Sequence, residues 1–299
     1  MQKKILAIYY SQTGQLGEII DCFTAPFIGS GATVEKVNIS PVNSYPFPWT
    51  GKGFFEVMPD SVLGIPIALA PFQLKESHYD LVIFGYQAWF LSPSIPANSL
   101  LQDPQFANIL SHTPVITITG ARNMWLSAYD RVRDSLAKAG ANLVGNIALV
   151  DRHANPVSFV TIFHWMLHGK KDRYLNIFPV PGVAEADIQH TKTFGTIAVS
   201  YLNKNDWSGL QAELVGQKAV KINYGLMLVE SKARWIFKAW ARFISKRKKK
   251  GPWLTVFKYY LLIAFFIGAP ILYVLDALFI RPFSAKRIRK EKQHYLGVN

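Results

Sequence analysis

Residues 5–15 read ILAIYYSQTGQ, and this stretch decides the fold. An apolar run of β-type residues ends in a short turn, and a helix-compatible segment follows. At the carboxyl end of a parallel strand, such a turn aims the hydroxyls of Ser11 and Thr13 and several backbone N–H groups at a phosphate, with Gly14 permitting close approach. The alternative interpretation is an N-capped helix after an edge strand, without a ligand.

The glycine spacing narrows the class of ligand. The turn carries neither the G-x-G-x-x-G pattern of dinucleotide-binding folds nor the G-x-x-x-x-G-K-[ST] pattern of nucleoside triphosphatases. It resembles instead the phosphate loop of flavodoxins, which encloses the monophosphate of flavin mononucleotide (FMN). Flavodoxins commonly place a further hydroxyl where this chain has Leu16, so the resemblance implies fewer side-chain donors here. The residues expected to hold the phosphate are Ser11, Gln12, Thr13, Gly14 and Gln15.

Apolar runs typical of buried strands alternate with helix-compatible stretches through the first two thirds of the chain. Near-continuous apolar strands separated by helices predict a parallel sheet that is covered on both faces. Five such units suit an α/β flavodoxin-like order, with the ligand beyond the carboxyl ends of the strands. The predicted strands are residues 5–10, 34–39, 81–86, 115–119 and 143–150.

The predicted domain covers residues 1–205, with 206–225 as a linker and 226–299 as a tail. An insert at 40–77 is rich in proline and aromatic residues, including Trp49, Phe54 and Phe55, and we expect it to form a lid or channel. Cys22 is the single cysteine, so neither a disulfide framework nor a thiolate metal cluster is expected, and the histidine spacing matches no metal motif.

The net charge of +14 is concentrated at one end of the chain. From residue 226 onward, sixteen Lys and Arg face three acidic residues, a surplus of thirteen that leaves about +1 for the first 225 positions. These basic residues flank apolar stretches instead of a base-reading element, so nucleic acid is not the expected partner. The expected partner is an anionic membrane surface.

Two segments of the tail support that expectation. Residues 226–245 repeat apolar positions at helical spacing with Lys and Arg largely elsewhere, as in a basic amphipathic helix at a membrane surface. The alternative is a helix docked on the domain, with its lysines in solvent. Residues 259–275 carry no charge but are short for crossing a bilayer, and both flanks are basic, which disfavours a single span. These features favour a shallow helical hairpin or in-plane insertion over a true span or a buried helix. Pro270 in the middle of the segment predicts a kink.

The amino terminus shows no signal peptide. The sequence therefore predicts a peripheral or monotopic protein at the cytoplasmic face of a membrane.

Two further loops follow the third and fourth predicted strands, where a flavodoxin-like sheet encloses the flavin ring. Aromatic rings there can stack on an isoalloxazine, and amide or guanidinium groups can bond its polar edge. Trp89 is the preferred stacking partner, although packing in a core or lid is the alternative for each aromatic residue. The candidate ring-binding residues are Tyr86, Gln87, Trp89, Phe90, Gly120, Asn123 and Trp125, with Arg122 beside them.

A titratable cluster follows the fifth predicted strand. His153 is the candidate general base, Asp151 is expected to orient it, and Arg152 or Arg122 is expected to stabilise a developing anion. Three adjacent side chains do not all point in one direction, so a salt-bridged loop is an equally weighted alternative.

The stretches YYSQTGQL, YPFPWTGKGFFEVMPDSVLGIP, AWFLSPSIP, GARNMW and ALVDRH together resemble the dialkylresorcinol condensing enzymes of bacteria, from residue 3 to about residue 201. That resemblance implies an aromatase that works with a ketosynthase partner. Its implied reaction is FMN-dependent oxidation of a lipophilic 2,5-dialkylcyclohexane-1,3-dione to a dialkylresorcinol in dialkylresorcinol and flexirubin-type lipid biosynthesis. A lipid-quinone reductase, an electron-carrier flavodoxin and a non-enzymatic membrane adaptor remain open.

Overall fold

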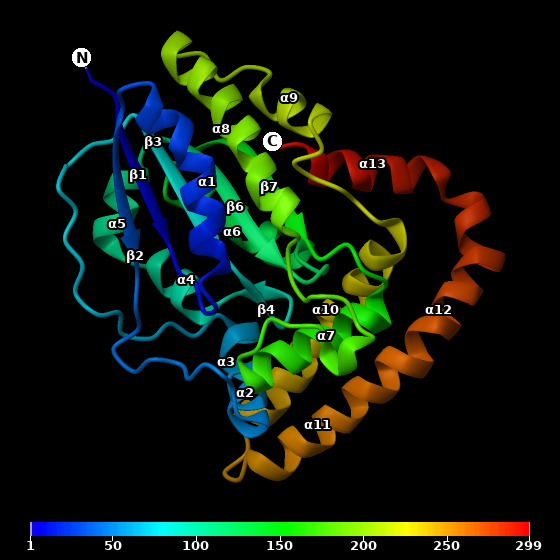
Figure 1. The fold of residues 1–299 in the computed structure, drawn as a ribbon. Helices are drawn as coiled ribbons and strands as arrows, with labels where there is room; N and C mark the ends of the chain where they lie inside the picture. The colour runs from blue at the N-terminus through cyan, green and yellow to red at the C-terminus, as the bar shows by residue number, and fades with distance from the viewer. Residues whose placement is uncertain (1, 299) are drawn as a thin grey trace.

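Five parallel strands form the centre of the molecule. The computed structural model describes residues 2–298, and its sheet has the strand order β2-β1-β3-β6-β7, with every neighbouring pair parallel (Figure 1). The predicted flavodoxin-like fold is thereby confirmed. The strands are β1 (Lys4–Tyr9), β2 (Thr33–Asn38), β3 (Leu81–Tyr86), β6 (Pro114–Ala121) and β7 (Asn142–Val150).

Helices cover both faces of the sheet. Ile5 and Ala7 of β1 point into one fully buried cluster, whereas Leu6 and Ile8 point into the other. This burial on both sides is why the strands read as near-continuous apolar runs. The first face is covered by α1 (Gln15–Gly29), α8 (Glu185–Lys204) and α9 (Leu210–Gly216), and the second by α4 (Ile95–Leu100), α5 (Pro104–Leu110) and α6 (Leu126–Lys138).

The stretch 206–225, predicted to be a linker, contains α9. Leu210 and Leu214 lie one helical turn apart and are fully buried in the cluster beneath α1 and α8. This stretch therefore belongs to the globular core and is not a free connector.

The aromatic insert lies at the carboxyl edge of the sheet. It contains α2 (Gly51–Glu56) and α3 (Met58–Leu63), and the Trp49 N–H donates to the carbonyl of Met166 at 2.8 Å. Met166 belongs to α7 (Asn155–His168), so the insert and α7 are held together across the sheet edge. The smaller elements nearby are β4 (Ala88–Trp89), β5 (Ser92–Pro93) and the 3-10 turn Tyr174–Asn176.

The amphipathic helix predicted at 226–245 is α10 (Tyr224–Ser245). Much of its apolar face is not free, because Phe237, Ala241 and Ile244 are buried in one cluster with Phe55 of the insert. The helix also brings the carboxylate of Glu230 to the start of α6, where the Ser127 N–H donates to it at 2.6 Å.

One helical path, Gly251–Phe283, is 33 residues long and is the single helix within residues 2–298 that is long and apolar enough to cross a membrane. It joins α11 (Gly251–Ile263), a π-helical turn (Ala264–Gly268), α12 (Ala269–Leu275), a second π-helical turn (Asp276–Ile280) and a 3-10 turn (Arg281–Phe283). The chain does not reverse, so the hairpin form of insertion is not built. Helical conformation continues through Pro270, the second residue of α12, which begins directly after the first π-helical turn.

This long helix arches beside the domain (Figure 1) and contacts it near both ends. Phe257 is fully buried against Phe55 and Phe237 near one end, and the Tyr224 hydroxyl donates to the Asp276 carboxylate at 2.8 Å near the other. The final helix, α13 (Ala285–Leu296), then returns to α9, and its Tyr295 packs beside α6. Both flanks of the apolar helix therefore lie on the same domain, which a single crossing of a bilayer does not permit.

Glu230→Gln is expected to flatten the pH dependence of stability. Burial raises the pKa of Glu230 to about 7, opposed by the Ser127 N–H, with Asp130 adding a smaller increase. The folded protein therefore keeps a proton that the unfolded chain loses above its ordinary pKa of 4.5, and the free energy of unfolding falls as pH rises from there to about 7. The loss is up to about 3 kcal/mol.

Thermal unfolding of the detergent-solubilised protein below and above this window checks the expectation. Glutamine keeps an acceptor for Ser127 but does not ionise. The stability of the variant should therefore decrease less with rising pH than that of the wild type. Glu291→Gln, on the exposed surface of α13, is the matched control. An unchanged slope in Glu230→Gln contradicts the assignment.

Candidate functional site

The turn between β1 and α1 has the features of an anion site. Gly14 adopts a left-handed conformation with φ +87°, and a Cβ added there meets no atom within 4 Å. The Ser11 hydroxyl oxygen is buried and has no hydrogen-bond partner in the structure. The first N–H groups of the 15-residue helix α1 lack intrahelical acceptors and carry its positive dipole end. A phosphate at this turn satisfies both the orphaned hydroxyl and these N–H groups.

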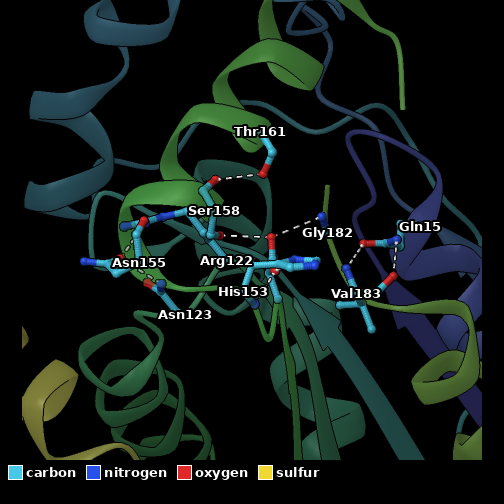
Figure 2. A network of polar contacts seen from close by, with 10 residues as sticks. Gln15, Arg122, Asn123, His153, Asn155, Ser158, Thr161, Gly182 and Val183 are labelled. Atoms are coloured by element: carbon cyan, nitrogen blue, oxygen red, sulfur yellow. Dashed lines mark hydrogen bonds and ion pairs between the residues drawn. The ribbon is translucent and has the colours of Figure 1, made fainter. Parts of the chain in front are cut away.

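The two glutamine side chains of the turn are already engaged. The Gln15 amide exchanges hydrogen bonds with the backbone N–H and carbonyl of Val183, at 3.0 and 3.1 Å (Figure 2). The Gln12 amide donates to the carbonyls of Tyr45 and Pro46, at 3.2 Å each. These side chains hold neighbouring loops in place, and both residues still line the cavity described below.

The loop after β3 forms a tight hairpin. Gln87 accepts the Gln12 N–H at 3.1 Å, which ties this loop to the phosphate turn. Trp89 of β4 packs edge-on against Tyr10, Tyr45 and Trp49, with ring centroids 5.9, 5.2 and 5.4 Å apart. Tyr86 is fully buried in the sheet core and does not line the cavity.

The turn of that hairpin is strained. Phe90 and Leu91 have φ values of +48° and +61°, a pattern that two-residue hairpins usually give to Asn and Gly. Each bulky residue in this region costs about 1–2 kcal/mol. Leu91 is 9% exposed and Phe90 packs on Phe237, so burial of both side chains beside α10 offsets that cost.

Arg122, after β6, places a positive charge among aromatic rings. Its guanidinium donates to the Asn155 side-chain oxygen at 2.7 Å and lies 5.9 Å from the ring centre of Phe159 and 5.6 Å from that of Phe265. Burial lowers the pKa of Arg122 to about 10, while the Asp151 carboxylate opposes that shift. The group therefore stays charged at neutral pH and can hold an anionic oxygen.

The remaining residues of the loop after β6 have different positions. Gly120 lines the cavity, and Asn123 donates to Asn155 at 2.8 Å while its own side-chain oxygen is buried without a partner. Trp125 is 2% exposed and packs on Tyr129 in a separate cluster, away from the cavity.

A buried carboxylate organises the loop after β7. One oxygen of Asp151 lies 2.6 Å from Nδ1 of His153, and the other accepts the Ser158 hydroxyl at 2.9 Å (Figure 2). The His153 ring is 39% exposed and is held by this contact. Arg152 points elsewhere and pairs with Asp187. The structure thus brings Asp151 and His153 together and leaves Arg152 apart.

The turn, the hairpin and the loop after β6 meet in one cavity of about 320 Å³. Its polar end includes Thr13, Gln87 and Arg122. Ser11, Asn123, Asp151 and His153 are not in its wall. The apolar remainder is lined from three helices, chiefly by Phe159 and Phe163 of α7, Val229, Ala233, Ile236 and Phe237 of α10, and Tyr260, Leu261, Ala264, Phe265 and Ala269 of the long helix.

These apolar wall residues were not among the predicted site residues. Four of them lie on α10 at a helical spacing that the sequence already shows and that predicts a membrane-facing surface: Val229, Ala233, Ile236 and Phe237. That periodicity predicts an apolar helix face but does not show whether protein or lipid covers it. Among residues 2–298, no group of three or more His, Cys, Asp or Glu side chains is arranged to hold a metal ion.

Comparison with known proteins gives similar folds only. No family model and no curated protein matches the chain. A flavoprotein from Lactobacillus acidophilus, solved in complex with FMN, is 18% identical, with 49% of this chain and 93% of that chain covered and a TM-score of 0.39. A putative flavoprotein from Bacteroides eggerthii is 16% identical, with 50% and 89% covered and a TM-score of 0.40. Flavodoxin 1 from Bacillus cereus is 14% identical, with 68% and 98% covered and a TM-score of 0.34. Similarity at this level carries no information about the ligand of this chain.

Ser11→Ala tests whether the turn holds a phosphate. Because the Ser11 hydroxyl has no partner within the chain, its removal should leave the melting temperature of the FMN-free protein unchanged. A charge-assisted hydrogen bond contributes about 1.5–3 kcal/mol, so FMN affinity should fall by about tenfold or more. Titration followed by flavin fluorescence measures this.

Ser245→Ala is the control, since it removes another buried hydroxyl without a partner, on α10. Equal FMN affinity in the two variants would contradict the phosphate assignment.

Proposed function

We propose that this protein is an FMN-dependent oxidoreductase that oxidises a lipophilic cyclic 1,3-dione to a resorcinol. The observation that carries the proposal is that one cavity combines the phosphate-type turn, the Arg122 guanidinium and an apolar wall. Each serves a different part of the reaction. The specific substrate follows from the resemblance to the dialkylresorcinol condensing enzymes, including their ketosynthase partner, and the cavity is compatible with it.

The residues present fit FMN. Ser11, Thr13, Gly14 and the start of α1 offer donors for one phosphate, as the orphaned Ser11 hydroxyl indicates. Gln87, Trp89, Gly120 and Arg122 line the adjoining part of the cavity, where the ring would lie. When bound, the flavin supplies an acceptor for a hydride.

The chain itself serves the proton half of the reaction. Aromatisation of a cyclohexane-1,3-dione removes a proton from the carbon beside a carbonyl and a hydride from the next carbon. The product is a ring enone, whose two carbonyls then both enolise to the phenol groups of the resorcinol. Arg122 is positioned to stabilise the enolate oxygen, since its charge is surrounded by Phe159 and Phe265 instead of water. His153, oriented by Asp151, is the proton acceptor.

His153 is outside the cavity wall, so it reaches the substrate through water or after a local movement. Asp151 links the two parts of the site, because its carboxylate holds His153 and also accepts the Gly182 N–H at 3.4 Å. Gly182 lines the cavity. Any movement of the His153 loop is therefore coupled to that wall.

Substitution of the three basic side chains separates their roles. Arg122→Ala and His153→Ala should each lower turnover of an alkylcyclohexane-1,3-dione by about 10²-fold or more. Arg152→Ala should change it by less than about twofold, because that guanidinium is paired with Asp187. Steady-state rates at matched FMN content measure the effect.

Arg122→Lys adds a second readout, since an ammonium keeps the charge without the planar contact to the rings. It should recover part of the rate lost in Arg122→Ala. A rate for Arg152→Ala as low as that for His153→Ala would contradict this distribution of roles.

We also propose that the outer face of the long helix binds an anionic membrane. Ile263, Ile267 and Ile271 are 53–59% exposed on a helix that is held against the domain on its other side. Lys246–Lys250 precede the helix, and Arg281, Lys286, Arg287, Arg289 and Lys290 follow or end it. An apolar strip between basic clusters matches a leaflet of anionic lipid, as in an in-plane helix.

Ile267→Asp combined with Ile271→Asp should release the protein from anionic vesicles. Two carboxylates on this face oppose both apolar burial and the negative surface, so the cosedimenting fraction should fall by about tenfold or more. FMN content should stay the same. Ile28→Asp, at an exposed apolar position on α1, is the control. Equal cosedimentation of the two proteins would rule out this face as the membrane contact.

A further inference from the structure

The cavity joins two unlike environments. At one end lie Thr13, Gln87 and Arg122, which carry hydroxyl, amide and guanidinium groups. At the other end the wall is apolar and comes from α7, α10 and the long helix. A ligand that fills it must itself have a polar head and an apolar extension.

The long helix has two apolar faces with different surroundings. Ala264 and Phe265 line the cavity, and Ala269 in the same wall is 7% exposed. Ile263 and Ile267, adjacent in sequence to that inner face, are 59% and 57% exposed. One helix therefore separates the cavity from the surface that we assign to the bilayer.

The wall has a rim on α10. Ile236 lines the cavity yet is 38% exposed, and its neighbour Trp235 is 65% exposed. Ala233, one turn earlier on the same helix, also lines the cavity and has a small side chain. Because Ile236 is both in the cavity wall and partly exposed, the apolar wall that includes Arg122 reaches the molecular surface at this rim.

We infer that the ligand enters sideways from the bilayer between α10 and the long helix, so that its polar ring reaches Arg122 while an alkyl chain on that ring stays in the apolar part of the cavity. This inference rests on the proposed function and adds the route and orientation of the substrate. The substrate class is an amphiphile with one enolisable ring and a linear alkyl chain of substantial length.

The contact of Phe265 with Arg122 gives this route a defined end. The Phe265 ring lies 5.6 Å from the guanidinium and comes from the helix that borders the bilayer. An incoming ring has to take the place of Phe265 or lie beside it. A ligand with a short chain gains only the contact of its ring with the Arg122 guanidinium. A ligand with a long chain also buries apolar surface along α10 and the long helix.

The test compares cyclohexane-1,3-dione carrying an ethyl or a dodecyl chain. Binding to the full-length, FMN-loaded protein in phosphatidylcholine–phosphatidylglycerol vesicles is measured by competition with a fluorescent long-chain fatty acid, and FMN content is measured by absorbance. Affinities are referred to the free aqueous ligand, with partition into protein-free vesicles measured separately, because the bilayer buries the same methylenes as the cavity. On that scale, each methylene that the cavity buries should tighten binding by about fourfold, so the wild type should prefer the dodecyl ligand by about 10²-fold or more.

Ala233→Trp places an indole in the cavity, and the preference for the dodecyl ligand should fall at least tenfold. Ala239→Trp makes the same change on the exposed side of α10 and should keep the wild-type preference. Ile236→Lys, at an exposed position that tolerates polarity, places an ammonium at the rim. It should slow transfer of the dodecyl ligand from vesicles while leaving affinity for the ethyl ligand unchanged.

Two results would overturn the inference: equal chain preference in Ala233→Trp and Ala239→Trp, or unchanged transfer from vesicles in Ile236→Lys. The proposed function fails separately, if the wild type neither retains nor rebinds FMN. Loss of chain preference in Ala233→Trp would still support the alkyl cavity in that case, because the fatty-acid competition does not depend on flavin.

Discussion

The parallel arrangement of the sheet constrains everything else in this molecule. All five strands present their carboxyl ends at one edge, and helices bury both faces, so that edge is where loops from distant parts of the chain meet. The phosphate-type turn, the strained hairpin and the Arg122 loop are all there. The insert, α7, α10 and the long helix then cover this edge with apolar side chains, which turns an open crevice into a partly covered cavity.

The electrostatics follow from that enclosure. Arg122 sits where water is scarce, which lowers its pKa but leaves it charged, with the Asp151 carboxylate favouring the charged form. Asp151 is itself satisfied by His153, Ser158 and Gly182. The Arg122 guanidinium thus lines the cavity, whereas the Asp151 carboxylate is buried outside its wall and holds a partly exposed His153 imidazole. A buried guanidinium beside a cavity stabilises charge that develops on a substrate oxygen more strongly than the same group does in bulk water.

Much of the fold could be predicted because its signals are local. The strand 81–86 and the turn around Gly14 are recognisable from a few adjacent residues, and each falls where the sequence places it. The carboxyl-edge loops were also predictable as a group, since strand order fixes which loops meet. The contact between Asp151 and His153 agrees with both interpretations of that cluster, an oriented base and a salt-bridged loop.

The cavity wall was less accessible to prediction, for a physical reason. An apolar helical face can be buried by protein or by lipid, and the spacing of residues such as Ala233 and Phe237 is the same in both cases. The direction of an individual side chain is equally hidden, which is why Arg152 and Trp125 were grouped with residues that the structure places elsewhere. The linker predicted at 206–225 was misread because Leu210 and Leu214 form too short a helix to give a clear period.

The attachment of the long helix at both ends limits how deep it can go. A helix held alongside its own domain can sink into lipid by about half its diameter, roughly 5 Å, and it then adds area to one leaflet alone. Expanding one leaflet is easiest where its headgroups are already spread apart. With the membrane contact proposed above, convexly curved regions of a membrane should therefore retain more of this protein than flat ones, so the shape of the bilayer would help to determine where it accumulates.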